Sequence, residues 1–194
     1  MSATRLPLAT AGVLLLASAP FGAFVFGDSR PFREIAGTAP HVTHYALALL
    51  AMLALAVAVP QLRARRGSTG AQLPGPLVSA ALIATVLTAC THFVQVFVTP
   101  FLADVAPVAL DEQGGALMVG LVASWLLFLA AWVSVGVVGL RRGVLGRGAG
   151  VLLVVAALLQ PVIGPLAAVP LGAALLALSR REQTSGVVPV AVAA

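Results

Sequence analysis

The chain has 194 residues, of which 60% are hydrophobic and 9% are charged, and its formal net charge is +5. Soluble globular domains carry about 25% charged residues, so this composition excludes that class and predicts an all-α protein that crosses a membrane several times. The apolar segments leave room for one helical bundle at 1–181 and a disordered tail at 182–194. Lysine and asparagine are absent from the sequence, and this bias in codon use favours a bacterial source with a GC-rich genome.

The first apolar segment, 6–26, is expected to be a membrane helix. Residues 17–19, Ala-Ser-Ala, resemble the cleavage site of a signal peptide. Pro20 follows them directly and the apolar run continues, which favours a retained helix that bends near Pro20. Small residues on this helix offer positions for close packing: Gly12, Ala19 and Ala23.

A polar loop at 27–40 leads to a second membrane helix, expected at 41–59 and ending before Pro60. His41 and His44 are three positions apart, so they share one face of this helix. The same face carries small residues and one leucine: Ala48, Ala51, Leu55 and Ala58. Because a neighbouring helix can approach this face most closely, we expect it to be buried.

The third segment, 77–99, combines the length of a membrane helix with a polar face. As a helix it extends roughly 34 Å, against a hydrocarbon core of about 30 Å. Five polar side chains recur at intervals of three and four: Thr85, Thr88, His92, Gln95 and Thr99. Exposure of this face to lipid would be costly, so it is expected to meet protein or a water-filled cavity. Cys90, the single cysteine, lies on another face and is interpreted as a small buried side chain.

After an acidic loop at 100–115, a fourth helix is expected at 116–140. Small residues recur along it at a spacing that suits close packing against a neighbour: Ala116, Gly120 and Ser124, then Ala131 and Ser134. Trp125 and Trp132 lie well inside this helix and are interpreted as packing or lipid-facing residues.

The last apolar run, 150–179, is too long for one ordinary span and short for two. Three turn-forming residues lie near its middle: Pro161, Gly164 and Pro165. We therefore expect two short helices, at 149–163 and 166–179, which gives six membrane segments. The alternative is five segments with one long, kinked C-terminal helix.

Arginine is distributed unevenly between the loops. With a cytoplasmic N-terminus, the inner segments hold nine arginines and one glutamate, whereas the outer loops hold two arginines and five carboxylates. By the positive-inside rule this asymmetry predicts that both termini are cytoplasmic and that the protein lies in a cell membrane. Topology and contact with lipid headgroups explain the high pI of about 11.4, so no nucleic-acid partner is expected.

This topology places all three histidines in the outer half of the membrane. His92 lies about 10 Å below the outer end of its helix, and Gln95, one turn nearer the surface, lies at about the depth of His44. Consecutive antiparallel helices are usually neighbours, so we expect a polar pocket that opens toward the outer loops. Its predicted members come from three helices: His44, Thr88, His92, Gln95 and Ser124. The Ser124 hydroxyl is the expected hydrogen-bond partner of His92.

Three function classes fit such a pocket. The protein binds or passes a small solute or protons, or it is a membrane redox protein in which His41, His44 and His92 hold haem or a metal ion. The third class is an accessory subunit whose polar face meets another membrane protein. The sequence has no HExxH, GxSxG or P-loop pattern, so no catalytic residue is predicted.

Overall fold

The computed structural model describes residues 5–65, 70–111 and 116–184. Throughout these ranges the regular structure is helical and no strand occurs. Four helical segments are long and apolar enough to cross a membrane: Arg5–Gly27, Ala39–Ala64, Gly75–Val105 and Val119–Arg141. The prediction of an all-α membrane bundle is confirmed.

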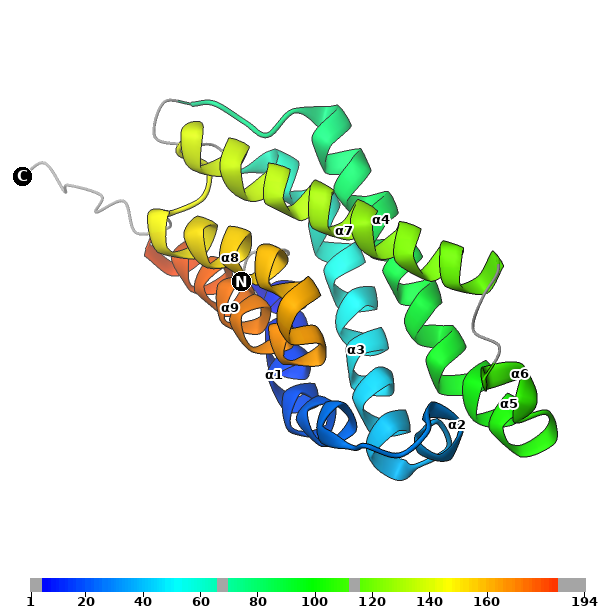
Figure 1. Ribbon diagram of the computed structural model, residues 1–194. Coiled ribbons are helices and arrows are strands. Elements are labelled where there is room, and N and C mark those ends of the chain that lie inside the picture. Colours follow the sequence, from blue (N-terminus) through cyan, green and yellow to red (C-terminus); the bar gives the residue numbers. More distant parts are fainter. Residues whose placement is uncertain (1–4, 66–69, 112–115, 185–194) are drawn as a thin grey trace, which may run out of the picture.

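Six helices pack in a closed ring (Figure 1). In order round the ring they are α1 (Arg5–Gly27), α3 (Ala39–Ala58), α4 (Gly75–Phe93), α7 (Ala116–Arg141), α8 (Arg147–Ile163) and α9 (Ala168–Thr184). Each helix packs against the next, and α9 closes the ring on α1. Because the number of helices is even, every neighbouring pair can run antiparallel, including α9 and α1, which are not consecutive in the chain.

Short helical segments extend or connect the six helices. They are α2 (Phe32–Ile35), η1 (Val59–Ala64), η2 (Val94–Val98), α5 (Thr99–Val105), α6 (Val108–Asp111) and η3 (Gly164–Ala167). The second predicted helix starts slightly earlier than expected and does not stop at Pro60, because η1 continues it. Pro60 stands in the first turn of η1, where the N–H that proline lacks would have no partner in the helix.

Charged residues separate to the two ends of the ring. One end, called here the arginine end, carries these arginines: Arg63, Arg65, Arg141, Arg142, Arg147 and Arg180. Hydrogen bonds at this end include those from Nη1 of Arg142 to the carbonyl of Gln72 at 2.9 Å and from Nη2 of Arg65 to the carbonyl of Leu178 at 3.5 Å. The opposite end, called the acidic end, carries α2, α5 and α6, and α2 packs against α6.

The third predicted helix continues past Pro100, so the expectation of a loop from residue 100 is wrong. Residues 94–98 form a π-helical turn, in which the amide of Thr99 donates to the carbonyl of Val94. Pro100 has no N–H, and in a regular α-helix its ring would press on the preceding turn. The wider π turn provides room for the ring, and the helix then runs on to Val105.

The C-terminal apolar run folds as a hairpin, and the alternative of one long kinked helix is wrong. The chain reverses at Gly164, whose φ of +51° lies in the left-handed region that favours glycine. At roughly 26 Å each, α8 and α9 are shorter than a hydrocarbon core of about 30 Å. Helix α9 extends to Thr184, three residues into the predicted tail. The rest of that tail, 185–194, lies outside the described residues.

Glycines permit close contact between α1 and α9 and between α7 and α8. A Cβ at Gly12 of α1 would stand 2.8 Å from the carbonyl oxygen of Gly172 in α9, and the reverse distance is the same. On α7 the predicted packing face is partly wrong: Gly120 is exposed and has no neighbour within 4 Å. A close contact with α8 is made further along, where a Cβ at Gly136 would stand 2.5 Å from Cγ2 of Val154. Small size permits close packing, but the ring decides which face of α7 turns inward.

The predicted polar face of the third helix meets protein. Thr85, Thr88 and Thr99 are buried, whereas Phe93 and Phe97 on other faces are half exposed. Cys90 is exposed on the outer surface, so its interpretation as a buried residue is wrong. On α3, the histidine and alanine face is buried along its whole length, as predicted.

Candidate functional site

A cavity of about 240 Å³ lies between α3, α4, α7 and the turn that joins α8 to α9. Its lining includes all five residues predicted for a polar pocket: His44, Thr88, His92, Gln95 and Ser124. A smaller cavity of about 70 Å³ shares His44, Thr88 and His92 with it and is lined by residues from all six helices of the ring. The second cavity therefore occupies the middle of the ring, next to the first.

Other polar or aromatic residues line the larger cavity without having been predicted: Tyr45, Thr91, Trp125 and Gln160. Gln160 could have been recognised from the sequence, because it is the one side-chain amide in the apolar run between Gly150 and Leu178. Nothing in the sequence indicated that Tyr45 lines the cavity, since Tyr45 directly follows His44 and so belongs to a different face of a regular helix.

The ring of Tyr45 lies among the three histidines. Its centroid is 4.7 Å from that of His41, 4.8 Å from that of His44 and 5.6 Å from that of His92. His44 and His92 are thus both in contact with one aromatic ring, which links the start of α3 to the end of α4. An aromatic ring packs against each imidazole at a favourable distance.

His44 is oriented by the backbone of α1. Its Nδ1 lies 2.9 Å from the carbonyl oxygen of Ser18, and its side chain is only 4% exposed. A carbonyl oxygen can only accept a hydrogen bond, so Nδ1 carries a proton. A neutral ring of this tautomer has a free lone pair on Nε2.

His92 and Gln95 line the cavity and each carries a buried polar atom without a partner among the described residues. Nδ1 of His92 and Oε1 of Gln95 are both buried and have no hydrogen bond within the described part of the chain. Gln95 lies in the π turn of η2, and π turns occur often at functional sites. Buried polar atoms of this kind are usually satisfied by a bound water or ligand.

His41 stands apart from the cavity. Its side chain is fully buried between Phe32 and Tyr45, and the ring centroids of His41 and Phe32 are 5.7 Å apart. The side chain of Gln95 is nearby, yet neither ring nitrogen of His41 has a hydrogen-bond partner among the residues that the structure describes.

Ser124 does not bond to His92, which corrects the predicted pairing. Its hydroxyl lies 3.0 Å from that of Thr91 and 2.9 Å from the carbonyl of Leu121. Thr91, one position before His92, thus takes the role expected of the histidine. Each of the two hydroxyls has the other and a backbone carbonyl as hydrogen-bond partners, so neither requires the imidazole.

The described residues give no support for the predicted binding of a metal ion by the histidines. Within the described ranges there is no group of three His, Cys, Asp or Glu residues that could hold a metal ion. The Tyr45 ring lies among the three imidazoles, and Nδ1 of His44 is taken up by a carbonyl. The arrangement supplies hydrogen-bonding groups rather than a set of ligands.

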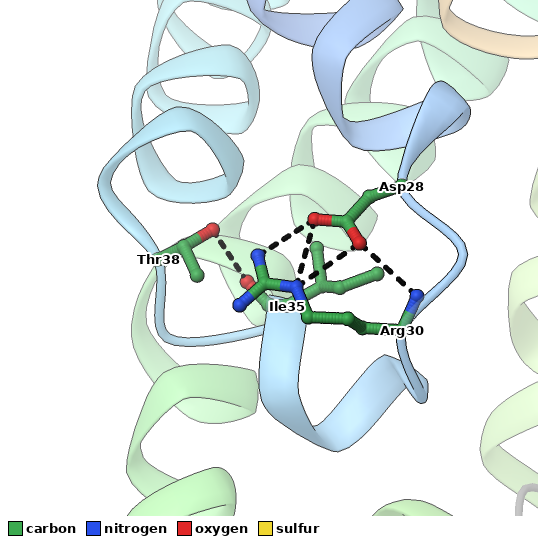
Figure 2. A network of polar contacts seen from close by, with 4 residues as sticks. All are labelled: Asp28, Arg30, Ile35 and Thr38. Carbon is green, nitrogen blue, oxygen red and sulfur yellow. Dashed lines mark hydrogen bonds and ion pairs between the residues drawn. The ribbon is translucent and has the colours of Figure 1, made fainter.

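A short segment at the acidic end, between α1 and α3, is held by hydrogen bonds of Asp28, Arg30 and Thr38 (Figure 2). Asp28 accepts hydrogen bonds from the backbone amide and the guanidinium of Arg30, with an Nη2–Oδ2 distance of 2.6 Å. These hydrogen bonds and the charge of Arg30 lower the pKa of Asp28 below its ordinary value. The Thr38 hydroxyl donates to the carbonyl of Ile35 at 2.7 Å just before α3 begins. These hydrogen bonds hold the segment that contains α2, and Phe32 of α2 packs against His41.

Comparison with protein-family models, with characterised proteins and with solved structures gives no match in any of the three.

Proposed function

We propose that this membrane protein binds a small polar solute, or protons, in the cavity lined by His44, Thr88, His92, Gln95 and Ser124. The observation that supports the proposal is the convergence of these side chains on one hollow in an otherwise apolar ring of helices. Polar groups inside a membrane are expensive, and where they occur they usually serve a ligand or an ion path.

The size of the cavity limits the ligand. A volume of about 240 Å³ accommodates about eight water molecules, at about 30 Å³ each. Pockets for drug-sized ligands range from about 300 to 1,000 Å³. The ligand is therefore a small molecule, or water that carries protons.

The lining comes from the halves of the helices that lie nearer the acidic end. His44 is in the first part of α3, His92 is near the end of α4, and Ser124 is in the first part of α7. We assign the acidic end to the outer face of a cell membrane, because arginines concentrate on the cytoplasmic side. The ligand then enters from outside.

The other two function classes have weaker support. A redox or metal centre requires convergent ligands, and the described residues contain no such group. An accessory subunit requires a surface that selects a protein partner. The exposed residues along the ring, such as Phe93 and Phe97, fit lipid equally well.

Cysteine accessibility tests the proposal. In a Cys90→Ala background, Thr88→Cys and Ser124→Cys are treated from outside with a small, membrane-impermeant methanethiosulfonate. Both should react, because both positions line the cavity. Ala81→Cys is the matched control: it lies on the same helix as Thr88, is fully buried and lines neither cavity. The proposal fails if both cavity positions remain as unreactive as Ala81→Cys while all three label after denaturation.

A further inference from the structure

We infer that the ligand of the cavity is an uncharged molecule that donates a hydrogen bond to Nε2 of His44, such as a small amide or alcohol. The inference rests on the proposed function and adds the chemical class of the ligand. It follows from the hydrogen bonds that the lining residues have already made and from the charges that the lining lacks.

His44 presents an acceptor to the cavity. Its Nδ1–H is used in the hydrogen bond of 2.9 Å to the carbonyl of Ser18, a backbone group that cannot reverse its role. Nε2 of the neutral ring therefore has a lone pair, and the structure shows no donor for it among the described residues. A ligand with an N–H or O–H group completes this pair.

The hydroxyl groups around His44 also donate their protons in hydrogen bonds within the protein. Thr88 donates to the carbonyl of Ala84 at 2.9 Å, so its oxygen faces the cavity only as an acceptor. Ser124 and Thr91 each have a backbone carbonyl and one another as partners. Oε1 of Gln95 also has no partner among the described residues. The amides of Gln95 and Gln160 in the lining can donate, so a ligand that both donates and accepts, as an amide or alcohol does, can pair with both kinds of group. A ligand that donates a hydrogen bond satisfies an acceptor that otherwise remains unpaired.

The lining argues against a charged ligand. Neither cavity has an Asp, Glu or Arg among its described lining residues. An ion that leaves water for such a site loses its hydration and gains no counter-charge. A neutral molecule avoids that penalty and still forms the hydrogen bond to His44.

Four probes of similar size separate these alternatives: acetamide, N,N-dimethylacetamide, acetate and acetamidinium. The protein, labelled with ¹⁵N at histidine, has three imidazoles, so its ring nitrogen signals in detergent micelles can be resolved and assigned with single variants. We expect a protonated Nδ1 and an unprotonated Nε2 for His44. Acetamide should shift the His44 Nε2 signal in a saturable manner. Dimethylacetamide, which has no N–H, should bind about tenfold more weakly, which corresponds to one hydrogen bond. Acetate and acetamidinium should also bind at least about tenfold more weakly, because their charge loses its hydration without gaining a counter-charge.

Two variants localise the effect, with His92 as the reporter because it lines the same cavity. In His44→Asn the carboxamide can still donate to Ser18 but places no acceptor at the position of Nε2, so the acetamide concentration at half saturation should rise about tenfold. Cys90→Ala is the control: Cys90 is exposed and lines neither cavity, and the concentration should stay unchanged.

The possible failures are distinct. If acetate, acetamidinium or dimethylacetamide saturates the site as readily as acetamide, the ligand class is wrong while a binding site remains. A proton on Nε2 of His44 in place of Nδ1 also overturns the class. If no probe shifts the signals of His44 or His92, the proposed function fails together with the inference.

Discussion

The indole nitrogen of Trp132 donates a hydrogen bond to Oγ1 of Thr85 at 3.2 Å, where both side chains are fully buried. The Thr85 hydroxyl proton goes to the carbonyl of Ala81 at 2.7 Å, so its oxygen is free to accept from the indole. This bond ties α4 to α7 and satisfies the one polar atom of a large aromatic residue in the core.

Loss of the threonine hydroxyl should weaken this tie. Thr85→Val is expected to destabilise the protein by about 1 kcal/mol, because the indole N–H then lacks its partner. Trp132→Phe should cost more, since it also leaves a cavity. Unfolding in detergent measures both, and the double variant should be less destabilised than the sum of the two. Strict additivity would show that the two side chains do not interact.

The contact between α1 and α9 depends on glycine. Gly12→Ala should destabilise the protein by about 1 to 3 kcal/mol, since the added Cβ would stand 2.8 Å from a backbone oxygen that cannot move aside easily. Gly120→Ala is the control: it has no neighbour within 4 Å and should gain up to about 1 kcal/mol in helix propensity. Equal effects of the two changes on the unfolding transition would contradict the packing described for α1 and α9.

Gln95 is expected to serve binding at the expense of stability. Because its Oε1 is buried without a partner, Gln95→Leu should leave the unfolding midpoint unchanged or raise it. The same variant should lose the response of His92 to acetamide. Cys90→Ala, on the exposed side of the same helix, should alter neither measurement. A marked loss of stability in Gln95→Leu would mean that the amide has a structural partner.

The acidic loop provides a pH-dependent contact. Since the folded-state pKa of Asp28 is lowered by Arg30, its stabilising effect is complete above the unfolded value of about 3.9 and is lost as the pH falls through the folded value. The Arg30 amide, which donates to Asp28 at 3.0 Å, should therefore exchange its hydrogen faster, relative to the intrinsic rate, in strong acid. Asp28→Asn should weaken this protection near neutral pH, and its remaining protection should not vary over the acid range.

Membrane topology can be tested at both chain ends. Reporter fusions at the N-terminus and after Glu182 should both give cytoplasmic signals, because the arginine end carries the start of α1 and the end of α9. A periplasmic signal after Glu182 together with a cytoplasmic N-terminus would mean that the α8–α9 hairpin does not return to the side from which it starts.

The sequence by itself determined the long helices and the faces of α3 and α4 that turn inward. Apolar length identifies the spans, and a period of 3.6 residues separates the buried threonines of α4 from Phe93 and Phe97, because lipid excludes polar groups from one side of a helix. Turn chemistry identified the hairpin at Gly164. These features are local, and each can be recognised within one segment.

Only the tertiary structure decided which side chains meet. The closed ring brings Gln160 to the cavity, packs Tyr45 among three histidines and pairs Ser124 with Thr91 in place of His92. These relationships depend on how each helix is rotated about its axis and on the π turn that follows His92 and contains Gln95. Periodicity shows which face is buried, but a rotation or shift of a few ångströms, set by packing across the whole ring, selects the partner.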